Sequence, residues 1–327
     1  MILVRSPLRI TFGGGGTDLP SYYKLKEGFL ISAAIDKYVY VSILKPFTKG
    51  FFLKYSEIEK VLDVDSINHP IIRESLKYIC PNEDQIEVTT LADIPAGTGL
   101  GSSGSFTVGL VKALHNYRKT HINQKDIAKL ACEIEINKLN QPIGKQDQYA
   151  SAIGGLTCFK FKKNDSVTIA PLLISNDTLF QLEDRLLLFF TGFSRSANDI
   201  LDIQKKHTEA NNEEMIKNLD FVKKLGFDSK IALETGDVDC FGQIMHEHWI
   251  RKKSRSGNMT NKKIDEVYDI ALRNGAIGGK LVGAGGGGFL LFLAKDPKKL
   301  RNSIKNIGLE EVRFKFDFNG TQTIVNQ

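Results

Sequence analysis

The segment PAGTGLGSSGS (95–105) contains four glycines and four hydroxyl side chains between a strand-like run and a helix-like run. Glycine permits positive φ and lets main-chain N–H groups approach a ligand, and the N-terminus of a following helix adds positive partial charge. The segment is therefore predicted to bind an anion, with its serines capping the helix or binding Mg²⁺ on a phosphate. A tight turn without a ligand is the alternative, which the strand, loop and helix order disfavours.

Two common phosphate loops do not match this segment. GLGSSG (99–104) fits the dinucleotide pattern GxGxxG, but a second helix, 124–139, follows where a parallel strand ending in an acidic residue is required. The P-loop pattern also fails, because Gly104 is followed by Ser105 and Phe106 rather than by Lys. A third kind of phosphate loop is indicated.

Composition is that of a folded cytoplasmic protein. The 327 residues are 42% hydrophobic and 25% charged, and no run of about 18 apolar residues predicts a membrane span. The net charge of +6 suits an anionic small molecule at least as well as nucleic acid, and the basic cluster 249–257 has no aromatic residue besides Trp249. The four cysteines form no CxxC pair, so neither disulfides nor zinc are indicated. We expect neither a nucleic-acid partner nor a membrane partner.

The pattern of elements is mixed, an α/β (α+β) fold class. Strands are predicted at 2–12, 38–44, 85–93, 166–171, 186–190 and 311–318. Helices are predicted at 70–79, 106–119, 124–139, 195–206, 211–224, 228–234, 237–250, 261–274 and 297–307. The run of helices in the second part predicts two domains, 1–183 and 184–327.

Three glycine-rich segments resemble the signature motifs of the GHMP kinases, the superfamily that includes galactokinase, homoserine kinase, mevalonate kinase and phosphomevalonate kinase. SPLRITFGGGGTD (6–18) resembles the first motif, PAGTGLGSSGS the second and KLVGAGGGGF (280–289) the third, in the family's order and spacing. The resemblance covers essentially the whole chain. It implies an N-terminal half like ribosomal protein S5 domain 2, a C-terminal ferredoxin-like half, and a cleft between them for ATP and an acceptor.

The second motif is then expected to wrap the triphosphate of ATP. The predicted ATP-binding residues are Pro95, Gly97, Thr98, Gly99, Leu100, Gly101, Ser102, Ser103, Gly104 and Ser105. Phosphoryl transfer depends mainly on positioning and charge stabilisation, so a bare backbone with a metal ion suits it.

Two catalytic residues follow from resemblance to the galactokinase branch. Asp147, in a segment (140–155) predicted as a loop, is the candidate to accept or orient the acceptor's hydroxyl proton. Arg9 is the candidate to hold Asp147 ionised and to neutralise the transferring phosphoryl group. Lys145 replaces an uncharged residue of galactokinases, which leaves open which cation does this work.

The predicted magnesium ligands are Glu135 and Ser103. On the helix 124–139, Glu135 shares a face with small alanine side chains, which leave room for a metal. Ser102 is the alternative hydroxyl ligand, and a Glu on the helix surface without a role is the plain alternative.

The acceptor motif lacks the Glu and His of the galactokinase sequence GEHTD but keeps Asp18, which would accept hydrogen bonds from sugar hydroxyls. GGGGTDLPSY, GKQDQYASAIGG and the 245–254 stretch most resemble the D-glycero-D-manno-heptose 7-phosphate kinase branch, with the fucokinase kinase half a close relative. This implies phosphate transfer from ATP to the anomeric 1-hydroxyl of the heptose 7-phosphate. The predicted substrate-binding residues are Gly14, Gly15, Gly16, Thr17, Asp18, Arg195, Lys253, Gly285 and Gly286.

Other functions stay open from the sequence. One is a kinase for a free sugar such as fucose or galactose, which would not need the basic residues Arg195 and 251–255. Another is a non-catalytic sensor of sugar and ATP, which the joint presence of Asp147, Glu135 and Ser103 disfavours. The residues of the adenine pocket and the oligomeric state, including a homodimer, are also open.

Overall fold

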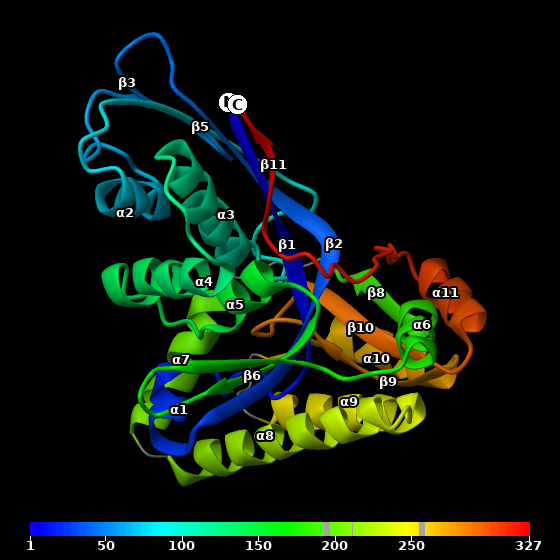
Figure 1. Cartoon of the computed structure of the whole chain (residues 1–327). Coiled ribbons are helices and arrows are strands. Elements are labelled where there is room, and N and C mark those ends of the chain that lie inside the picture. Colours follow the sequence, from blue (N-terminus) through cyan, green and yellow to red (C-terminus); the bar gives the residue numbers. More distant parts are fainter. Residues whose placement is uncertain (193–196, 211, 255–258) are drawn as a thin grey trace.

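The computed structural model of the chain describes residues 1–192, 197–210, 212–254 and 259–327 (Figure 1). The strands are β1 (Ile2–Gly13), β2 (Gly28–Leu44), β3 (Gly50–Lys54), β4 (Ile58–Val61), β5 (Gln85–Ala92), β6 (Leu156–Phe161), β7 (Val167–Pro171), β8 (Leu186–Phe190), β9 (Ala276–Leu281), β10 (Phe289–Ala294) and β11 (Gln322–Asn326). The helices are α1 (Pro20–Lys26), α2 (Pro70–Ile79), α3 (Ser102–Tyr117), α4 (Gln124–Cys132), the π-helix η1 (Glu133–Lys138), α5 (Gln146–Ile153), α6 (Asn176–Arg185), α7 (Ala197–Glu209), α8 (Glu213–Glu234), α9 (Val238–Lys253), α10 (Lys262–Arg273) and α11 (Pro297–Asn306). The predicted mixed α/β (α+β) class is confirmed.

The larger sheet has eight strands in the described chain and is built around β1 and the long strand β2. Its order is β11-β1-β2-β5-β3-β4, and β6 pairs with the first half of β2 and with β7. β3 and β5 are parallel, and the other pairs are antiparallel. α3 and α5 pack on one face of β1 and β2. This packing brings the start of α3, which follows the second motif, close to the start of α5.

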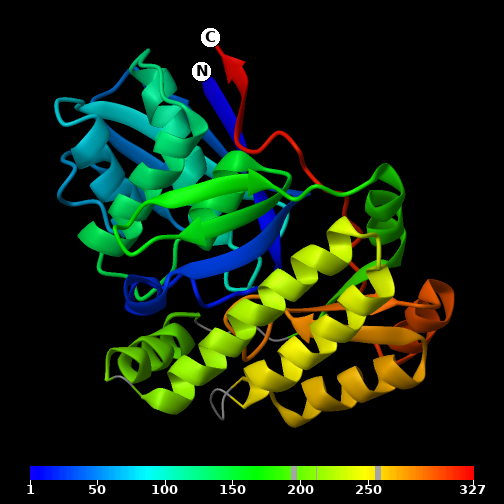
Figure 2. The ribbon, with the colours of Figure 1, turned by 60° about the horizontal axis from the view of Figure 1, so that its bottom comes forward.

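The smaller sheet, in the order β8-β10-β9, is antiparallel and lies beside the larger one (Figure 1). Its strands LLLFF and FLLFLA are buried almost throughout, which explains why they are continuously apolar. α9 lies on β9 at close range, since a Cβ on Gly278 would lie 2.0 Å from the carbonyl oxygen of Gly242. Figure 2 shows α9 and α10 in front of these strands, with α8 beside α9.

Two helix predictions were wrong in detail. The helix predicted at 124–139 is α4 followed by the π-helix η1, and those predicted at 211–224 and 228–234 are one helix, α8. Gly226 sits inside α8, and a Cβ there would lie 3.2 Å from the Cα atom of Gly14. Glycine is unfavourable in a helix interior, and the close packing of α8 on the first motif explains why it occurs at position 226.

The strand predicted at 311–318 was also wrong. This segment makes only isolated bridges among the described residues, Ile35 with Phe316 and Phe189 with Glu311. It passes from β8 in the smaller sheet to β2 in the larger one, so it pairs with each of these strands through a single bridge only. After this segment, β11 pairs with β1. The domain boundary at residue 183 lies between β7 and β8 and stays a prediction.

Within the described ranges, no helix is long and apolar enough to cross a membrane. The two chain ends lie together, where the Met1 amino group donates a hydrogen bond of 3.1 Å to the Gln327 carbonyl oxygen (Figure 1).

Candidate active site

All three glycine-rich motifs border one cleft, with a volume of about 340 Å³. One side is formed by β1 and the first motif, another by the starts of α3 and α5, and the third by β9 and the loop that follows it. A wider groove of about 820 Å³ lies on the other side of the loop before α5 and has no glycine of these motifs in its wall. The smaller cleft is therefore the candidate active site.

The second and third motifs pack backbone against backbone. Gly97, Gly99 and Gly101 have φ values of 78°, 87° and 80°, in the left-handed region that favours glycine. A Cβ on Gly283 would lie 2.6 Å from the Cα atom of Gly99, and a Cβ on Gly99 would lie 2.7 Å from the carbonyl oxygen of Val282. The bare backbone of PAGTGLGSSGS is thus required for contact between the two loops as well as for the expected anion.

The predicted ATP-binding residues divide into two groups. Those that line the cleft are Gly97, Gly99, Gly101, Ser102, Ser103 and Gly104. Those that do not line it are Pro95, Thr98, Leu100 and Ser105. The second group holds the loop in shape: for example, the Ser105 hydroxyl donates to the Pro7 carbonyl oxygen at 2.8 Å and Leu100 is fully buried. ATP binding by the first group stays a prediction.

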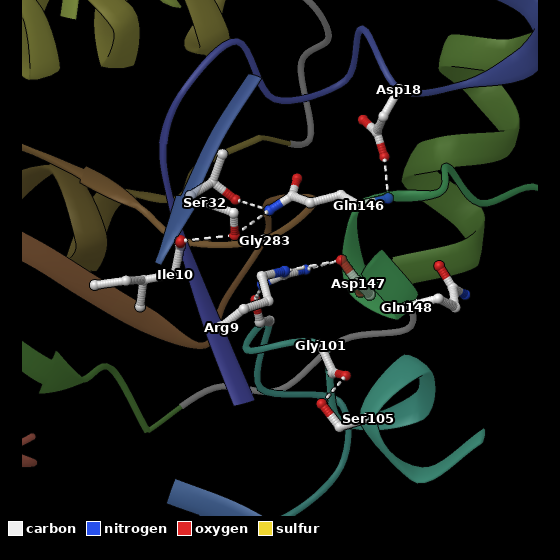
Figure 3. Close-up of polar contacts among 12 residues, drawn as sticks. Arg9, Ile10, Asp18, Ser32, Gly101, Ser105, Gln146, Asp147, Gln148 and Gly283 are labelled. Atoms are coloured by element: carbon white, nitrogen blue, oxygen red, sulfur yellow. Dashed lines mark hydrogen bonds and ion pairs between the residues drawn. The ribbon is translucent and has the colours of Figure 1, made fainter. Parts of the chain in front are cut away.

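Arg9 and Asp147 form an ion pair beside the start of α3 (Figure 3). Arg9 donates from Nε at 2.8 Å to Oδ1 of Asp147, with Nη2 2.7 Å from the same oxygen, and its Nη1 donates at 2.5 Å to the Gly99 carbonyl oxygen. The prediction that Asp147 lies in a loop was wrong, because it occupies the first turn of α5. A short helix fits here because Gly154 ends it, with φ of 78°. The arginine therefore links the carboxylate to the second motif.

Lys145 does not share this ion pair. Its Nζ lies 2.9 Å from Oδ2 of Asp165 and 5.2 Å from the ring centroid of Tyr23, in the wall of the wider groove. The sequence left open whether Arg9 or Lys145 neutralises Asp147, and the geometry selects Arg9.

Glu135 is fully buried and faces the start of α3. Its two carboxylate oxygens accept hydrogen bonds of 2.7 Å from the Ser103 hydroxyl and the Gln148 side-chain amide. Burial raises the pKa of Glu135, and the hydrogen bonds from Ser103 and Gln148 oppose this shift. The two predicted metal ligands are therefore brought together. Gln148, which the sequence reasoning missed, fixes the carboxylate from α5.

Asp18, the last residue of the first motif, also lines the cleft. Its oxygens accept hydrogen bonds of 3.1 Å from the main-chain N–H groups of Gly16 and Gln146. Figure 3 shows the bond from Gln146. Burial raises the pKa of Asp18, and the negative charge of Asp147 raises it further. A Cβ on Gly144 would lie 1.9 Å from Oδ2 of Asp18, so only glycine fits at that position.

The remaining predicted substrate residues differ in their positions. Gly15, Gly16, Asp18 and Gly285 line the cleft, whereas Gly14, Thr17, Gly286 and Lys253 are not part of its wall. Thr17 is buried and its hydroxyl donates to the Gly14 and Phe29 carbonyl oxygens, so it braces the first motif. Lys253 donates to Asp265 of α10 at 3.2 Å. Arg195, like Arg255, lies outside the described residues.

The sequence reasoning missed Lys280, which lies in the third side of the cleft beside His248 and Lys252 of α9. Lys252 belongs to the basic stretch 251–255 that was expected to serve a phosphorylated acceptor, and it does line the cleft. Lys280 is the first residue of the third motif, KLVGAGGGGF, and precedes its glycines. A charged residue inside a strand between apolar neighbours was the available signal, because such a side chain must have a special environment. Gln146 was also missed, and its amide donates to the hydroxyls of Thr11 and Ser32 beside β1 (Figure 3).

Comparisons with known proteins agree with this geometry. The family description "GHMP kinases N terminal domain" matches residues 70–155, and "GHMP kinases C terminal" matches residues 229–308. The D-glycero-alpha-D-manno-heptose 7-phosphate kinase of Campylobacter jejuni is 32% identical, over 95% of this chain and 94% of that protein. The L-fucokinase/L-fucose-1-P guanylyltransferase of Bacteroides fragilis is 28% identical, and 34% of its length is matched.

A solved structure described as a D-glycero-D-manno-heptose 1-phosphate kinase from Bacteroides thetaiotaomicron is similar over the whole fold. Its TM-score is 0.82, with 26% sequence identity over 99% of both chains. A second, described as a putative sugar kinase from Campylobacter jejuni, has a TM-score of 0.76 and 28% identity, over 98% of this chain and 97% of that one. With the three motifs around one cleft and relatives matched along nearly its whole length, the chain belongs to the GHMP kinases, a family of ATP-dependent phosphotransferases.

Proposed function

We propose that this protein transfers the γ-phosphate of ATP to the anomeric 1-hydroxyl of D-glycero-D-manno-heptose 7-phosphate and so makes the 1,7-bisphosphate. The observation that carries the proposal is the Arg9–Asp147 pair, held 2.7 Å apart at the N-terminal end of α3 in the cleft that the three motifs share. The similarity to the Campylobacter jejuni heptose 7-phosphate kinase supports this acceptor. The product would serve nucleotide-heptose synthesis for surface polysaccharide, and we propose the cytoplasm as the compartment.

Each side chain has a distinct part in the proposed reaction. The main-chain N–H groups at the start of α3 bind the phosphates of ATP with the positive end of the helix behind them. Asp147 accepts the proton of the attacking hydroxyl or orients that hydroxyl, and Arg9 offsets charge on the phosphoryl group during transfer. Asp18 accepts hydrogen bonds from sugar hydroxyls and fixes the acceptor's orientation.

The oxygens of Glu135 and Ser103 fit a magnesium ion. Both are hard oxygen ligands of the kind Mg²⁺ prefers, and no basic side chain of the described residues pairs with the buried Glu135 carboxylate. No cluster of three or more His, Cys, Asp or Glu side chains occurs among the described residues, so the phosphates of ATP would complete the coordination. When bound, the ion neutralises phosphate charge and orients the γ-phosphate.

A panel of sugars and sugar phosphates tests the acceptor. Each is incubated with ATP and Mg²⁺, and ADP release is followed. The proposal requires a preference for the 7-phosphorylated heptose by orders of magnitude. Equal rates on free fucose or galactose would instead support the free-sugar kinase.

Asp147→Asn tests the catalytic assignment. The amide keeps the size of the side chain but cannot accept the proton, so kcat is expected to fall by about 100-fold or more. Binding of a non-hydrolysable ATP analogue should be within about threefold of the wild type, because Asp147 is not part of the expected phosphate contacts. Turnover at the wild-type rate would reject Asp147 as the base.

A further inference from the structure

We propose that Lys280, together with His248, forms the subsite for the phosphate that the acceptor sugar already carries. This inference rests on the proposed function, since it assigns one part of the same substrate. Of the basic residues first expected to bind that phosphate, Lys252 lines the cleft, whereas Lys253 is paired with Asp265 away from it. Lys280 and His248 were not among them.

Lys280 reaches the cleft from the smaller sheet. β9 alternates its side chains between two faces, and Lys280 points away from the apolar cluster that holds Leu281 and toward α9. Its Nζ donates to the Phe12 carbonyl oxygen at 2.8 Å and lies 3.3 Å from Nδ1 of His248. The lysine is only 3% exposed, yet it lines the cleft.

The charge of Lys280 is not balanced by the described protein. No carboxylate of the described residues forms an ion pair with it, and the charge that acts on it is the positive Arg9. Burial, followed by Arg9, lowers the pKa of Lys280 to about 7. Protonated Lys280, buried beside Arg9, favours binding of an anion, because the anion restores both the charge balance and the hydrogen bonds lost on burial and so stabilises the protonated lysine.

The neighbouring residues on α9 suit a phosphate. His248 and Lys252 are four residues apart and therefore lie on one face of the helix, and both line the cleft. Lys252 donates to the carbonyl oxygens of Leu281 and Gly283 and so holds the third motif beside Lys280. When Nδ1 of His248 accepts from Lys280, its Nε2 carries the proton, so the contact with the lysine fixes the tautomer of the ring.

A phosphate on the acceptor is favoured over the phosphates of ATP by position. The N–H groups expected to bind the phosphates of ATP belong to the start of α3, where Arg9 links Asp147 to Gly99. Lys280 and His248 instead belong to β9 and α9 and enter the cleft from the smaller sheet. One sugar held at Asp18, with its hydroxyl at Asp147, then has a separate cationic group for its distal end.

The test compares two acceptors in wild type and Lys280→Met. The acceptors are the heptose 7-phosphate and the same heptose without its phosphate, each assayed for kcat/KM with saturating ATP. For Lys280→Met we expect kcat/KM to fall by about 100-fold on the phosphorylated acceptor, because one partner of a buried charge contact is removed. On the free heptose, kcat/KM should change by no more than about threefold. Lys280→Arg should recover part of the preference.

The matched control is Lys223→Met. Lys223 is a partly buried lysine on α8 that also donates to carbonyl oxygens, those of Lys26 and Glu27, but it is not part of the cleft wall. Its kcat/KM should be unchanged on both acceptors. Thermal unfolding and binding of an ATP analogue show whether Lys280→Met is folded. If it is not, His248→Gln is used, with an expected loss of about tenfold on the phosphorylated acceptor only.

The outcomes separate the inference from the proposed function. A wild-type enzyme that does not prefer the phosphorylated heptose contradicts both. A wild-type preference that survives in folded Lys280→Met, or in His248→Gln where that variant is used, contradicts the subsite alone. Equal losses on the two acceptors also overturn it, because Lys280 would then act on the transferring phosphoryl group or on the fold.

Discussion

Gly104→Ala tests whether close packing of α3 on α5 sets the position of the catalytic carboxylate. A Cβ on Gly104 would lie 2.6 Å from the Cβ atom of Asp147 and 3.1 Å from its carbonyl carbon. An ordinary carbon contact is about 3.8 Å, so the helices must separate by about 1 Å. That movement is large beside the 2.8 Å hydrogen bond from Arg9 to Asp147. A displacement of this size at a catalytic group lowers kcat by about 100-fold.

The stability of Gly104→Ala should change much less than its activity. Overpacking costs about 1–3 kcal/mol, and the better helix propensity of alanine offsets about 1 kcal/mol, so the net loss is about 0–2 kcal/mol. kcat is measured by ADP release and the free energy of unfolding by urea denaturation.

The control for this variant is Gly109→Ala, in the same helix. A Cβ on Gly109 would meet the Ser6 hydroxyl at 3.0 Å and a methyl group of Val41 at 3.3 Å, on the side toward the large sheet. Its kcat should remain within about threefold of wild type. Wild-type kcat in Gly104→Ala, or equal losses in the two variants, would refute the argument from helix spacing.

Three further predictions follow from the site. Glu135→Gln should raise the Mg²⁺ concentration for half-maximal rate by about tenfold or more, because a carboxylate ligand is lost; an unchanged Mg²⁺ titration would exclude Glu135 as a ligand. Lys145→Met should lower the unfolding temperature, through loss of its pair with Asp165, but keep kcat within about threefold; a large loss of kcat would restore Lys145 as the catalytic cation. Lys280 has a pKa of about 7 in the folded protein, against the ordinary lysine pKa of 10.5, so between these pH values the unfolded chain binds more protons. The contribution of Lys280 to the free energy of unfolding should therefore increase from pH 7 to pH 10.5, with Arg9 and His248 facing it, and urea denaturation of Lys280→Met should lack this increase.

Much of the site was predictable because its signals are local. Glycines before a helix, hydroxyls at its start and a carboxylate among small residues each limit the backbone or the chemistry within a few residues. These signals correctly predicted the loop before α3 and the pairing of Glu135 with Ser103, which are hydrogen-bonded in the structure. Strand β8 was likewise predicted with its bounds, since a continuous apolar run in a buried sheet is a strong signal.

The errors occurred where distant segments decide. Asp147 was assigned to a loop because glycines flank it, but packing against α3 stabilises the short helix α5. The alternating pattern at 311–318 suggested a strand, but the segment is divided between two sheets. α8 passes through Gly226 because the first motif lies against it. The local sequence pattern cannot predict the conformation of these three segments. In each, a packing partner far away in the sequence overrides the local preference for helix, strand or loop.

By itself the sequence determined the family, the mixed fold class and the kind of chemistry, because motif residues restrict backbone geometry wherever they occur. Only the tertiary structure decided which charges meet. Arg9 and Asp147 are 138 residues apart, and Lys280 meets Phe12 across 268 residues. The choice of Arg9 over Lys145, and the burial of Lys280 among cations, depend on how two sheets and the helices around them pack. Those contacts arise from burial of apolar surface between segments far apart in the sequence, and the sequence around the charged residues does not indicate which segments will pack together.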